Sequence, residues 1–418
     1  MLKGFTREEK SWMLYDWANS AFSAIVAAII LPIFFKEIAR SGGVADVDAT
    51  AYWGYATSFG TLICAVFAPL LGTLGDFKGM KKKLFTGFML LGVVSTFLLA
   101  MTGSWQMLLL FYVLGTIGFS GSCVYYDSFL PDITTDERMD QVSALGYGLG
   151  YIGGSTIPLV ISLLLIQFGD AIGISTGLAT KLSFVLTAVW WLVFTIPMLK
   201  SVQQKHCIEP EKRIIPQTMR NMAKTIKMIF SNKSVFFFLI AYFFYIDGVG
   251  TIIHMATVFG DSCGLGSMDM MVILLVVQIV AFPFAIIYGK LAGKFGARKM
   301  ILFGILTYII VCAVGYNLEK MSDFLMLAVL VGTAQGGIQA LSRSFYGKII
   351  PAEYSSEYFG FFDVFGKFSA VIGPALFGFT AQITGVTHYG ALAVMAMFIV
   401  GGAIMVFLVP KQIEKVRQ

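Results

Sequence analysis

Charged residues are scarce in this chain of 418 residues: Asp, Glu, Lys and Arg make up 13% of it, about half the share found in ordinary soluble domains. Apolar residues make up 57%, and the mean hydropathy is +0.80. A soluble protein of this size cannot cover so much apolar surface with so few charges. The composition therefore excludes an ordinary soluble domain and predicts a protein that crosses a membrane several times.

Cysteine and histidine are also sparse, and several chemical motifs are missing. The five cysteines are odd in number and include no CxxC pair, so a disulfide scaffold is excluded. The three histidines show no HExxH spacing, and no GxxxxGK[ST] or GxSxG motif occurs. We therefore expect no enzyme activity, no cofactor, no metal site and no direct use of ATP.

Long apolar runs recur along the whole chain. A helix that crosses the hydrocarbon core needs about 20 mostly apolar residues. Twelve stretches meet this requirement: 13–36, 52–75, 84–102, 105–129, 143–168, 180–199, 234–258, 269–292, 299–317, 323–346, 358–384 and 387–409. They do not alternate with a period of two, which favours helices over barrel strands. The sequence thus predicts an all-α polytopic membrane protein with 12 transmembrane helices.

The basic residues are unevenly distributed among the predicted loops. With the N-terminus inside, only four of the 30 fall in outer segments: Lys36, Arg40, Lys181 and Lys320. Because Lys and Arg collect in cytoplasmic loops, both termini are predicted to be cytoplasmic. The same bias explains the net charge of +6, so no nucleic-acid partner is expected. The first apolar run is too long for a signal peptide and is predicted to be a retained span.

A long polar stretch divides the chain into an N-terminal six-helix bundle at 1–199, a cytoplasmic linker at 200–233 and a C-terminal six-helix bundle at 234–418. From Thr218 to Asn232 the linker is amphipathic. One face is apolar and the other basic: Met219, Met222, Ile226 and Ile229 against Arg220, Lys224 and Lys227. This pattern predicts a helix on the inner membrane surface. The alternative is a solvated linker that only sets the spacing.

The two bundles share a repeated sequence pattern. GTLGDFKGMKK at 72–82 recurs 217 residues later, at 289–299, as GKLAGKFGARK, with Gly293 in place of Asp76. Further matches at an offset of 216 follow in later helices. Such self-similarity predicts two pseudo-symmetric bundles arranged as parallel repeats, with a binding site between them near the middle of the membrane.

The loop at 72–82 resembles the signature loop of the major facilitator superfamily. YDWANSAF at 15–22, SFLPDI at 128–133 and FGFFDVFGKFSAVIGP at 359–374 are similar to the vacuole-effluxer-like branch, the autophagy-related amino-acid permeases and their bacterial relatives. The resemblance extends over nearly the whole chain and implies a secondary transporter that works by alternating access. For a bacterial-type member it implies the inner membrane and, by analogy, an amino acid or similar polar metabolite as substrate. We expect a monomer whose partners are this substrate and the lipid bilayer.

Two rival functions stay open. An exporter of lipophilic or drug-like compounds would fit a cavity dominated by Phe and Met. A non-transporting membrane sensor or a lipid-modifying enzyme is the alternative from another class, although the internal repeat and the signature loop favour transport. The rivals differ in whether a hydrophilic solute, a dye-like compound or nothing crosses the membrane.

Asp247 lies near the middle of the seventh predicted helix. At about 1.5 Å of rise per residue it is roughly 20 Å in from Val235, close to the bilayer midplane. Gly248 and Gly250 follow it and weaken the helix. Because an ionisable residue inside a span is expensive, we predict that Asp247 couples transport to protons or cations. The alternative is a carboxylate that caps broken backbone or pairs with a basic residue.

Five charged residues cluster in the inner third of the predicted spans: Asp16, Asp127, Arg343, Asp363 and Lys367. Ion pairs among them would bias the inward-open against the outward-open state, since an unpaired charge in low dielectric is costly. We predict that they form a cytoplasmic gate. A competing interpretation places Arg343 or Lys367 in the substrate site, where it binds a carboxylate or phosphate. A static ion pair with neither role is the third possibility.

The signature loop supplies a second candidate contact between the halves, built from Gly72, Asp76, Gly79, Lys81 and Lys82. Asp76 is predicted to accept backbone N–H groups at a nearby helix N-terminus and so to latch the halves when the protein opens outward. The second loop lacks the acidic residue, so its latch is expected to be weaker. The lysines of the first loop can equally reflect the positive-inside bias alone.

Polar and aromatic side chains within the spans are candidates for a substrate cavity: Tyr15, Asn19, Tyr147, Tyr151, Tyr245, Gln278, Gln335 and Gln339. Tyrosines supply aromatic walls with a hydrogen-bonding tip, and amides supply specificity. For each of them, packing or an interhelical hydrogen bond is the competing interpretation.

Overall fold

The computed structural model describes residues 3–262, 267–316, 321–386 and 388–410. Twelve of its helical stretches are long and apolar enough to cross a membrane, which confirms the predicted number. Several begin earlier than predicted: the fifth starts at Asp136 and the eleventh at Ala352. The C-terminal residues 411–418, on which part of the orientation prediction rests, lie outside the described residues.

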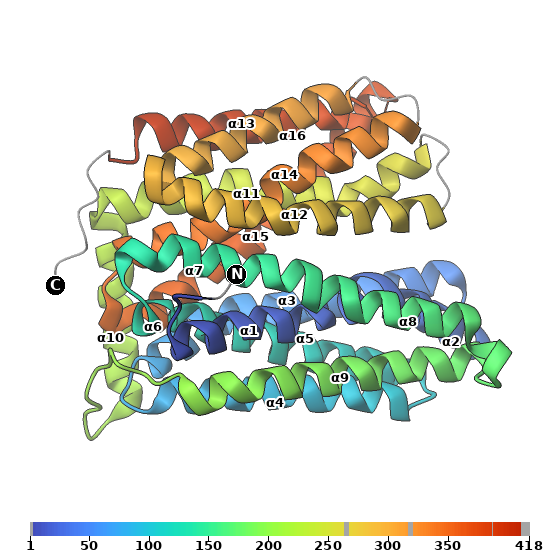
Figure 1. The fold of residues 1–418 in the computed structure, drawn as a ribbon, viewed down its shortest axis with the longest axis horizontal. Helices are drawn as coiled ribbons and strands as arrows, with labels where there is room; N and C mark the ends of the chain where they lie inside the picture. Colours follow the sequence, from blue (N-terminus) through green and yellow to red (C-terminus); the bar gives the residue numbers. More distant parts are fainter. Residues whose placement is uncertain (1–2, 263–266, 317–320, 387, 411–418) are drawn as a thin grey trace.

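The first six spans form a bundle of helices in the lower half of Figure 1. Their elements are α1 (Arg7–Ala21), the π-helical η1 (Phe22–Ile29) and α2 (Ile30–Ser41), then α3 (Asp46–Gly75), α4 (Met80–Met101), α5 (Trp105–Ser128), the short α6 (Leu130–Ile133), α7 (Asp136–Leu149), the π-helical η2 (Gly150–Thr156), α8 (Ile157–Phe168), η3 (Gly169–Ile172) and α9 (Thr176–Ser201).

The last six spans lie mostly in the upper half of Figure 1. They are α11 (Lys233–Ser262), α12 (Ser267–Phe295), α13 (Ala297–Gly315), α14 (Met321–Ile349), η4 (Ala352–Tyr354) with α15 (Ser355–Thr384), and α16 (Tyr389–Phe407). Between the sets, α10 (Ile214–Ser231) lies across one end of the molecule. We call this the linker end; it also carries the loops 76–79 and 350–354.

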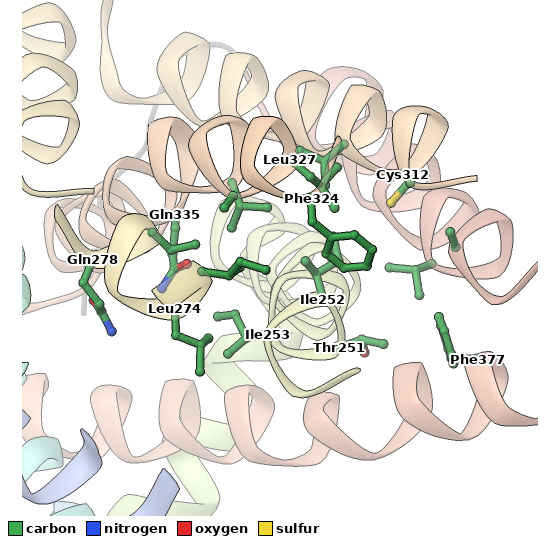
Figure 2. A pocket seen from close by; sticks show the side chains of 18 residues that line it. Thr251, Ile252, Ile253, Leu274, Gln278, Cys312, Phe324, Leu327, Gln335 and Phe377 are labelled. Carbon is green, nitrogen blue, oxygen red and sulfur yellow. The ribbon is translucent and has the colours of Figure 1, made fainter. Parts of the chain in front are cut away.

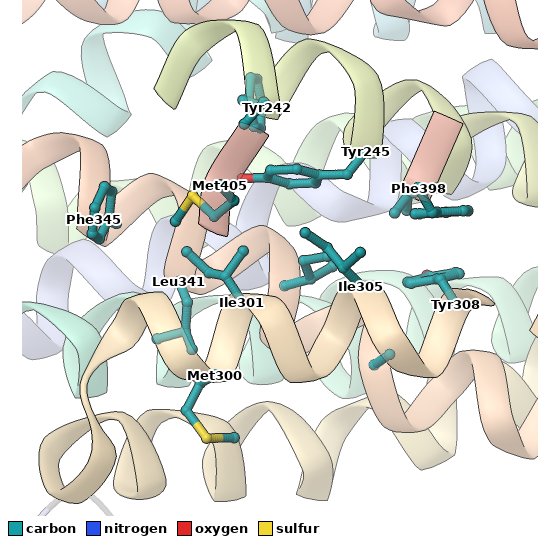
Figure 3. Close-up of a cluster of buried hydrophobic side chains, with 14 of the residues drawn as sticks. Tyr242, Tyr245, Met300, Ile301, Ile305, Tyr308, Leu341, Phe345, Phe398 and Met405 are labelled. Carbon is teal, nitrogen blue, oxygen red and sulfur yellow. The ribbon is translucent and has the colours of Figure 1, made fainter. Parts of the chain in front are cut away.

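Each six-helix set has its own hydrophobic core. One cluster of buried residues extends from Trp12 to Val202 and the other from Ile229 to Val409. Figure 3 shows part of the second, where Tyr308 stacks on Phe398 with ring centroids 5.0 Å apart. Large apolar side chains such as Phe59 stay exposed on the outer faces of the spans, a surface suited to lipid tails.

Glycines allow the first and fifth spans to touch along their backbones. A Cβ atom at Gly154 would lie 2.6 Å from Cβ of Ser20 and 2.8 Å from the carbonyl oxygen of Trp17. Both spans are π-helical in this region, at η1 and η2. Small residues therefore permit a close approach that larger side chains would prevent.

The two sets meet in two places: α3 packs against α15, and α7 packs against α12 and α14. A Cβ atom at Gly72 would lie 2.9 Å from Cα of Glu357 and closer still to the carbonyl oxygen of Ser356. On the other side of the interface, Gly289 of α12 lies against Ala144 of α7. At the linker end the halves are therefore in backbone contact, which leaves no space for a side chain.

The predicted amphipathic helix begins four residues earlier than Thr218, and its faces are used differently. Thr218, Thr225 and Ile229 are buried against the bundle, whereas Met219 and Ile226 are exposed. The physical reason is that small hydroxyl side chains permit a close approach: Thr218 donates its hydroxyl hydrogen to the carbonyl oxygen of Ile214 in the same helix and presents little bulk.

Gly72→Ala should weaken the closed linker end by about 1–3 kcal/mol, because the added methyl group meets backbone that cannot move aside. Electron–electron double resonance between nitroxide labels at the exposed positions 83 and 299 should then show an additional population of molecules with a longer label-to-label distance. The control is Gly87→Ala, since no heavy atom lies within 4 Å of a Cβ built at Gly87. Equal distance distributions for the two variants would contradict the close contact.

Candidate functional site

Arg343 of α14 lies at the centre of a buried charge cluster between the halves. Its guanidinium donates to Asp127 at 2.9 Å and to Asp16 at 3.1 Å. A third hydrogen bond, 2.9 Å long, goes to the hydroxyl of Ser143 on α7. All three partners belong to the N-terminal set, so one side chain of the C-terminal set joins three elements of the other.

Aromatic rings enclose the same guanidinium. Its central carbon lies 4.7 Å from the ring centroid of Trp12 and 4.3 Å from that of Tyr147. The hydroxyl of Tyr126 donates to Asp16 at 2.8 Å. Only 3% of the Arg343 side chain is exposed, so the carboxylates and the rings replace the water that would otherwise solvate the charge.

The other two predicted gate residues form a separate cluster. Lys367 pairs with Asp363 one turn away on α15 and also donates to the hydroxyl of Ser120 on α5. This second cluster also crosses from one half to the other. The structure thus divides the five predicted gate residues into two groups rather than one.

Asp76 lies at the start of α15, as a latch requires. Its carboxylate accepts the backbone N–H groups of Ser356 at 2.8 Å and Glu357 at 3.0 Å. The side chain is fully buried, and this burial raises the pKa of Asp76 to about 7. Gly79 follows with φ +72°, a left-handed conformation that glycine adopts without strain, and α4 begins after it.

The lysines of the signature loop differ from one another. Lys81 is completely buried and donates to Asp132 at 2.8 Å and, across the interface, to the hydroxyl of Ser355 at 2.8 Å. Lys82 donates to the carbonyl oxygen of Val202 at 2.9 Å, and Lys83 is exposed. The positive-inside bias alone does not explain the burial of Lys81, because that bias concerns charge near the membrane and requires no partner.

The first part of the linker is fixed beneath this loop. Asp132 accepts the backbone N–H groups of Lys205 at 3.0 Å and His206 at 2.8 Å, and its carboxylate lies 3.1 Å from Nδ1 of His206. Ile208 donates to the carbonyl oxygen of Asp76 at 2.8 Å. Sequence reasoning missed Asp132 as a functional residue, although it belongs to the SFLPDI segment.

The contact between Asp132 and His206 raises the pKa of the histidine and lowers that of the aspartate. The hydrogen bond to Asp132 raises the pKa of His206. Burial alone would raise the pKa of Asp132, but Lys81 and His206 together hold it below its usual range. Both groups therefore favour their charged forms when the linker is bound.

A further contact between the halves was not predicted. Lys348 of α14 forms a 2.6 Å ion pair with Asp140 of α7, which also accepts the hydroxyl of Ser344 at 2.7 Å. Asp140 precedes the predicted fifth span, which began at residue 143, and so it was not considered among the intramembrane charges.

Asp247 has the geometry of a carboxylate that caps broken backbone, which was the alternative to a coupling role. It is fully buried within the C-terminal set, and both carboxylate oxygens accept the N–H of Gly373 on α15, at 3.0 and 2.8 Å. Pro374 follows and interrupts the backbone hydrogen bonds of that helix. Asp247 thus supports a weakened part of α15, a geometry that is compatible with a structural role and with a coupling role.

Three of the predicted cavity residues bond only within their own six-helix set, Tyr15 and Asn19 in the N-terminal set and Tyr245 in the C-terminal set. Tyr15 donates to the hydroxyl of Ser122 at 2.8 Å, and Tyr245 shares a 2.7 Å hydrogen bond with Ser342. The side-chain amide of Asn19 points to the sulfur of Cys123 at 3.5 Å. These three residues therefore form interhelical hydrogen bonds, which was the alternative to a role in the substrate cavity.

Three other predicted cavity residues lie at the interface between the halves. Tyr151 of η2 donates to the side-chain oxygen of Gln339 on α14 at 2.9 Å. Tyr147 lies over Arg343, one turn from Tyr151, with their ring centroids 6.3 Å apart. The tyrosines of the fifth span therefore connect the charge cluster to the amides of α14.

A cavity of about 120 Å³ lies inside the C-terminal set between α11, α12, α14 and neighbouring helices. Most of its lining is apolar. Figure 2 shows Gln278 and Gln335 toward one end and Phe377 toward the other. The side-chain oxygens of both glutamines are buried and have no hydrogen-bond partner among the described residues, so they can accept hydrogen bonds from a small molecule or water in the cavity.

No group of three or more His, Cys, Asp or Glu side chains that could hold a metal ion occurs within the described ranges. The expectation that the chain needs no metal or cofactor stays a prediction.

Twelve spans in two six-helix sets have the architecture of the major facilitator fold. The crystal structure of the human organic anion transporter MFSD10 (TETRAN) is similar with a TM-score of 0.75 and 12% identity, over 96% of this chain and 99% of that one. Residues 6–417 match the family model described as "Vacuole effluxer Atg22 like", and the chain belongs to that family. The resemblance found in the sequence is thereby confirmed.

Two relatives illustrate the range of the family. The "Uncharacterized MFS-type transporter YxiO" of Bacillus subtilis (strain 168) is 48% identical over 412 residues, which are 98% of this chain and 96% of the relative. "Autophagy-related protein 22" of Botryotinia fuckeliana (strain B05.10) is 26% identical over 61% of this chain and 48% of its own length.

Arg343→Gln should destabilise the protein by about 3–5 kcal/mol, because it leaves the buried Asp16 and the partly buried Asp127 without a positive partner. Thermal unfolding in detergent measures the loss. Combining it with Asp16→Asn and Asp127→Asn should restore most of the stability, since no charge is then left without a partner. The matched control is Arg40→Gln, which removes an exposed ion pair with Asp46 and should change the midpoint little. A triple variant no more stable than the single one would refute the pairing argument.

His206→Asn should destabilise the protein more at acidic than at alkaline pH. Since the pKa of His206 is raised in the folded state, its stabilisation is complete below the ordinary histidine pKa of about 6.5. It is lost as the pH rises through the raised value. Because 39% of the imidazole side chain is exposed, the midpoint should fall by only about 1–3 °C at acidic pH. Melting curves at about pH 5.5 and 8.5 test this; a pH-independent difference would contradict it.

Proposed function

We propose that this chain moves a small solute across the bacterial inner membrane by alternating access, with the linker end on the cytoplasmic side. The observation that carries the proposal is the kind of contact between the halves. Ionic and hydrogen bonds from Arg343, Asp76, Lys81 and Lys348 gather at or near the linker end. Such contacts can break and be replaced by water when the linker end opens.

The magnitudes suit a switch. Moving a two-state equilibrium from 1:99 to 99:1 requires about 5.5 kcal/mol. A hydrogen bond to a charged group contributes roughly 1.5–3 kcal/mol, so a few of them can hold the cytoplasmic side closed. In this proposal the Arg343 cluster and the Asp363–Lys367 pair are the gate, and Asp76 is the latch that joins α3 to α15.

For the substrate we propose an amino acid or a similar polar metabolite. Gln335, Gln339 and Tyr151 offer hydrogen-bonding groups between and within the halves. The side-chain oxygens of Gln278 and Gln335 have no partner among the residues that the structure describes. The rival proposal, an exporter of lipophilic compounds, is favoured by one observation: the cavity in the C-terminal set has a mostly apolar lining. Uptake of a labelled amino-acid mixture and of a lipophilic dye into proteoliposomes distinguishes the two.

We propose further that Asp247 couples this transport to protons or cations. It is fully buried, and both of its oxygens bind one N–H group. A protonated Asp247 still retains an acceptor for Gly373, so the carboxyl group can change its charge without losing the contact with α15.

Asp247→Asn should abolish gradient-driven uptake of the labelled amino acids but preserve counterflow, which requires no coupling. The amide keeps one acceptor for Gly373, so the fold is expected to survive, as thermal unfolding will show. The exposed Asp48→Asn is the control and should transport normally. If counterflow and stability fall together, the role of Asp247 is structural; if uptake is unchanged, the coupling proposal fails.

A further inference from the structure

Glu357, the third residue of α15, is a buried acid that none of the proposed roles uses. Its exposed fraction is 0%, and neither side-chain oxygen has a hydrogen-bond partner among the described residues. Its backbone N–H binds Asp76, so its position is tied to the latch. The predicted eleventh span began at residue 358, so Glu357 was not considered among the intramembrane charges.

Three elements surround this carboxyl group. From α3 and its loop come Thr73, whose hydroxyl donates to the carbonyl oxygen of Pro69 at 3.0 Å, and Asp76. From α10 comes Thr225, which is itself buried. The helix α10 thus closes the site toward the linker side.

Positive charges near this site are engaged elsewhere or point away. Lys81 of α4 binds Asp132 and the hydroxyl of Ser355. The basic residues of α10 are exposed on its other faces: Arg220, Lys224 and Lys227. No ion pair of Glu357 is found among the described residues.

The other titratable groups near Glu357 are tyrosines and one further acid, Glu353. Tyr125 of α5 donates to the carbonyl oxygen of Leu71, and Tyr346 of α14 donates to that of Tyr358. Glu353, four residues before Glu357, is exposed. None of these groups supplies a positive charge.

The charge state follows from these contacts. The two N–H groups that Asp76 accepts favour its ionised form. Burial nevertheless raises the pKa of Asp76 to about 7, so its negative charge is largely present only above neutral pH. An ionised Glu357 would add a second negative charge beside Asp76, out of water and with only threonine hydroxyls and no positive charge next to it in the described part of the structure, a costly arrangement. A protonated carboxyl group avoids this cost and gains an O–H donor that can reach an acceptor nearby.

We propose that Glu357 is a proton-binding site: it takes one proton from the cytoplasmic solution when the linker end closes and returns it when the halves separate. The carboxylate and the proton form a neutral carboxyl group, and no other bond changes. The proposal rests on alternating access and adds a proton step on the cytoplasmic side, distinct from Asp247.

The internal repeat provides a comparison within the same chain. Ser128 and Ser344 match at an offset of 216, and the same offset relates Gln141 to Glu357. Where Asp76 faces Glu357, the repeat places Gly293 near Gln141, with 3.7 Å between a Cβ at Gly293 and Nε2 of Gln141. A neutral amide thus occupies the equivalent position in the other half, which makes Glu357→Gln a natural substitution.

The test is the pH dependence of closure, measured with labels at positions 83 and 299. In the wild type, the ratio of closed to open molecules should fall by up to tenfold per pH unit as the pH rises between about 5.5 and 8.5. Glu357→Gln should remain closed throughout and lose most of this dependence. The controls Glu353→Gln and His206→Asn should keep it. A wild type without pH-dependent closure, or a Glu357→Gln variant with the wild-type dependence, would overturn the proposal.

An infrared measurement covers the case in which Glu357→Gln does not fold. Difference spectra of the wild type between the closed and open states should contain the carbonyl band of a protonated carboxyl group at acidic pH. Asp247→Asn should keep this band, which then belongs to another acid. Its absence from the wild type and from Asp247→Asn would also overturn the proposal.

The two proposals fail in different ways. If the labels report one fixed distance and proteoliposomes show no flux, alternating access itself is wrong. If the distances change and solute crosses while Glu357→Gln behaves as the wild type, only the proton site is wrong.

Discussion

The structure depends on one constraint: charges buried between the halves need partners, and most of those partners lie on the opposite half. Arg343 shows this most clearly, since both of its carboxylates and its hydroxyl partner belong to the other half. Separation of the halves exposes these groups to water, which replaces the lost partners. Water or the other half can therefore satisfy the same groups, so two arrangements of the halves are accessible, whereas an intermediate state that is dry and unpaired would be costly.

Apolar composition and length were sufficient to predict the twelve spans, because a bilayer imposes a minimum apolar length on every helix that crosses it. The pairing of Asp76 with a helix N-terminus could also be predicted, since an acidic residue in a glycine-rich loop has few other interactions open to it. In contrast, Asp132, Asp140 and Glu357 were missed because each lies just outside a predicted boundary, where hydropathy no longer identifies a charge as unusual. Their partners come from distant parts of the chain, and a single sequence contains no signal for such pairs.

The predicted cavity residues show a second limit of sequence reasoning: residue type does not reveal where a side chain points. Tyr15 and Tyr245 carry the chemistry expected of a binding site, yet each has a partner inside its own bundle. Residue type cannot distinguish a helix face that points to the interface from one that points to the core, because both are apolar in a membrane protein. Gln335 and Gln278 differ from these tyrosines because their side-chain oxygens have no partner in the described part of the chain, a property that becomes visible in three dimensions alone.

The aromatic cage around Arg343 has a consequence for observing the protein at work. The indole of Trp12 lies against a full positive charge, 4.7 Å from the guanidinium carbon, and stacks on Tyr126 with centroids 4.3 Å apart. Arg343 belongs to one half, whereas both rings belong to the other. When the halves part, the field across the indole changes, and its absorption and emission must shift with it. In a variant that lacks the other five of the six tryptophans, Trp12 would serve as an intrinsic optical probe of the gate.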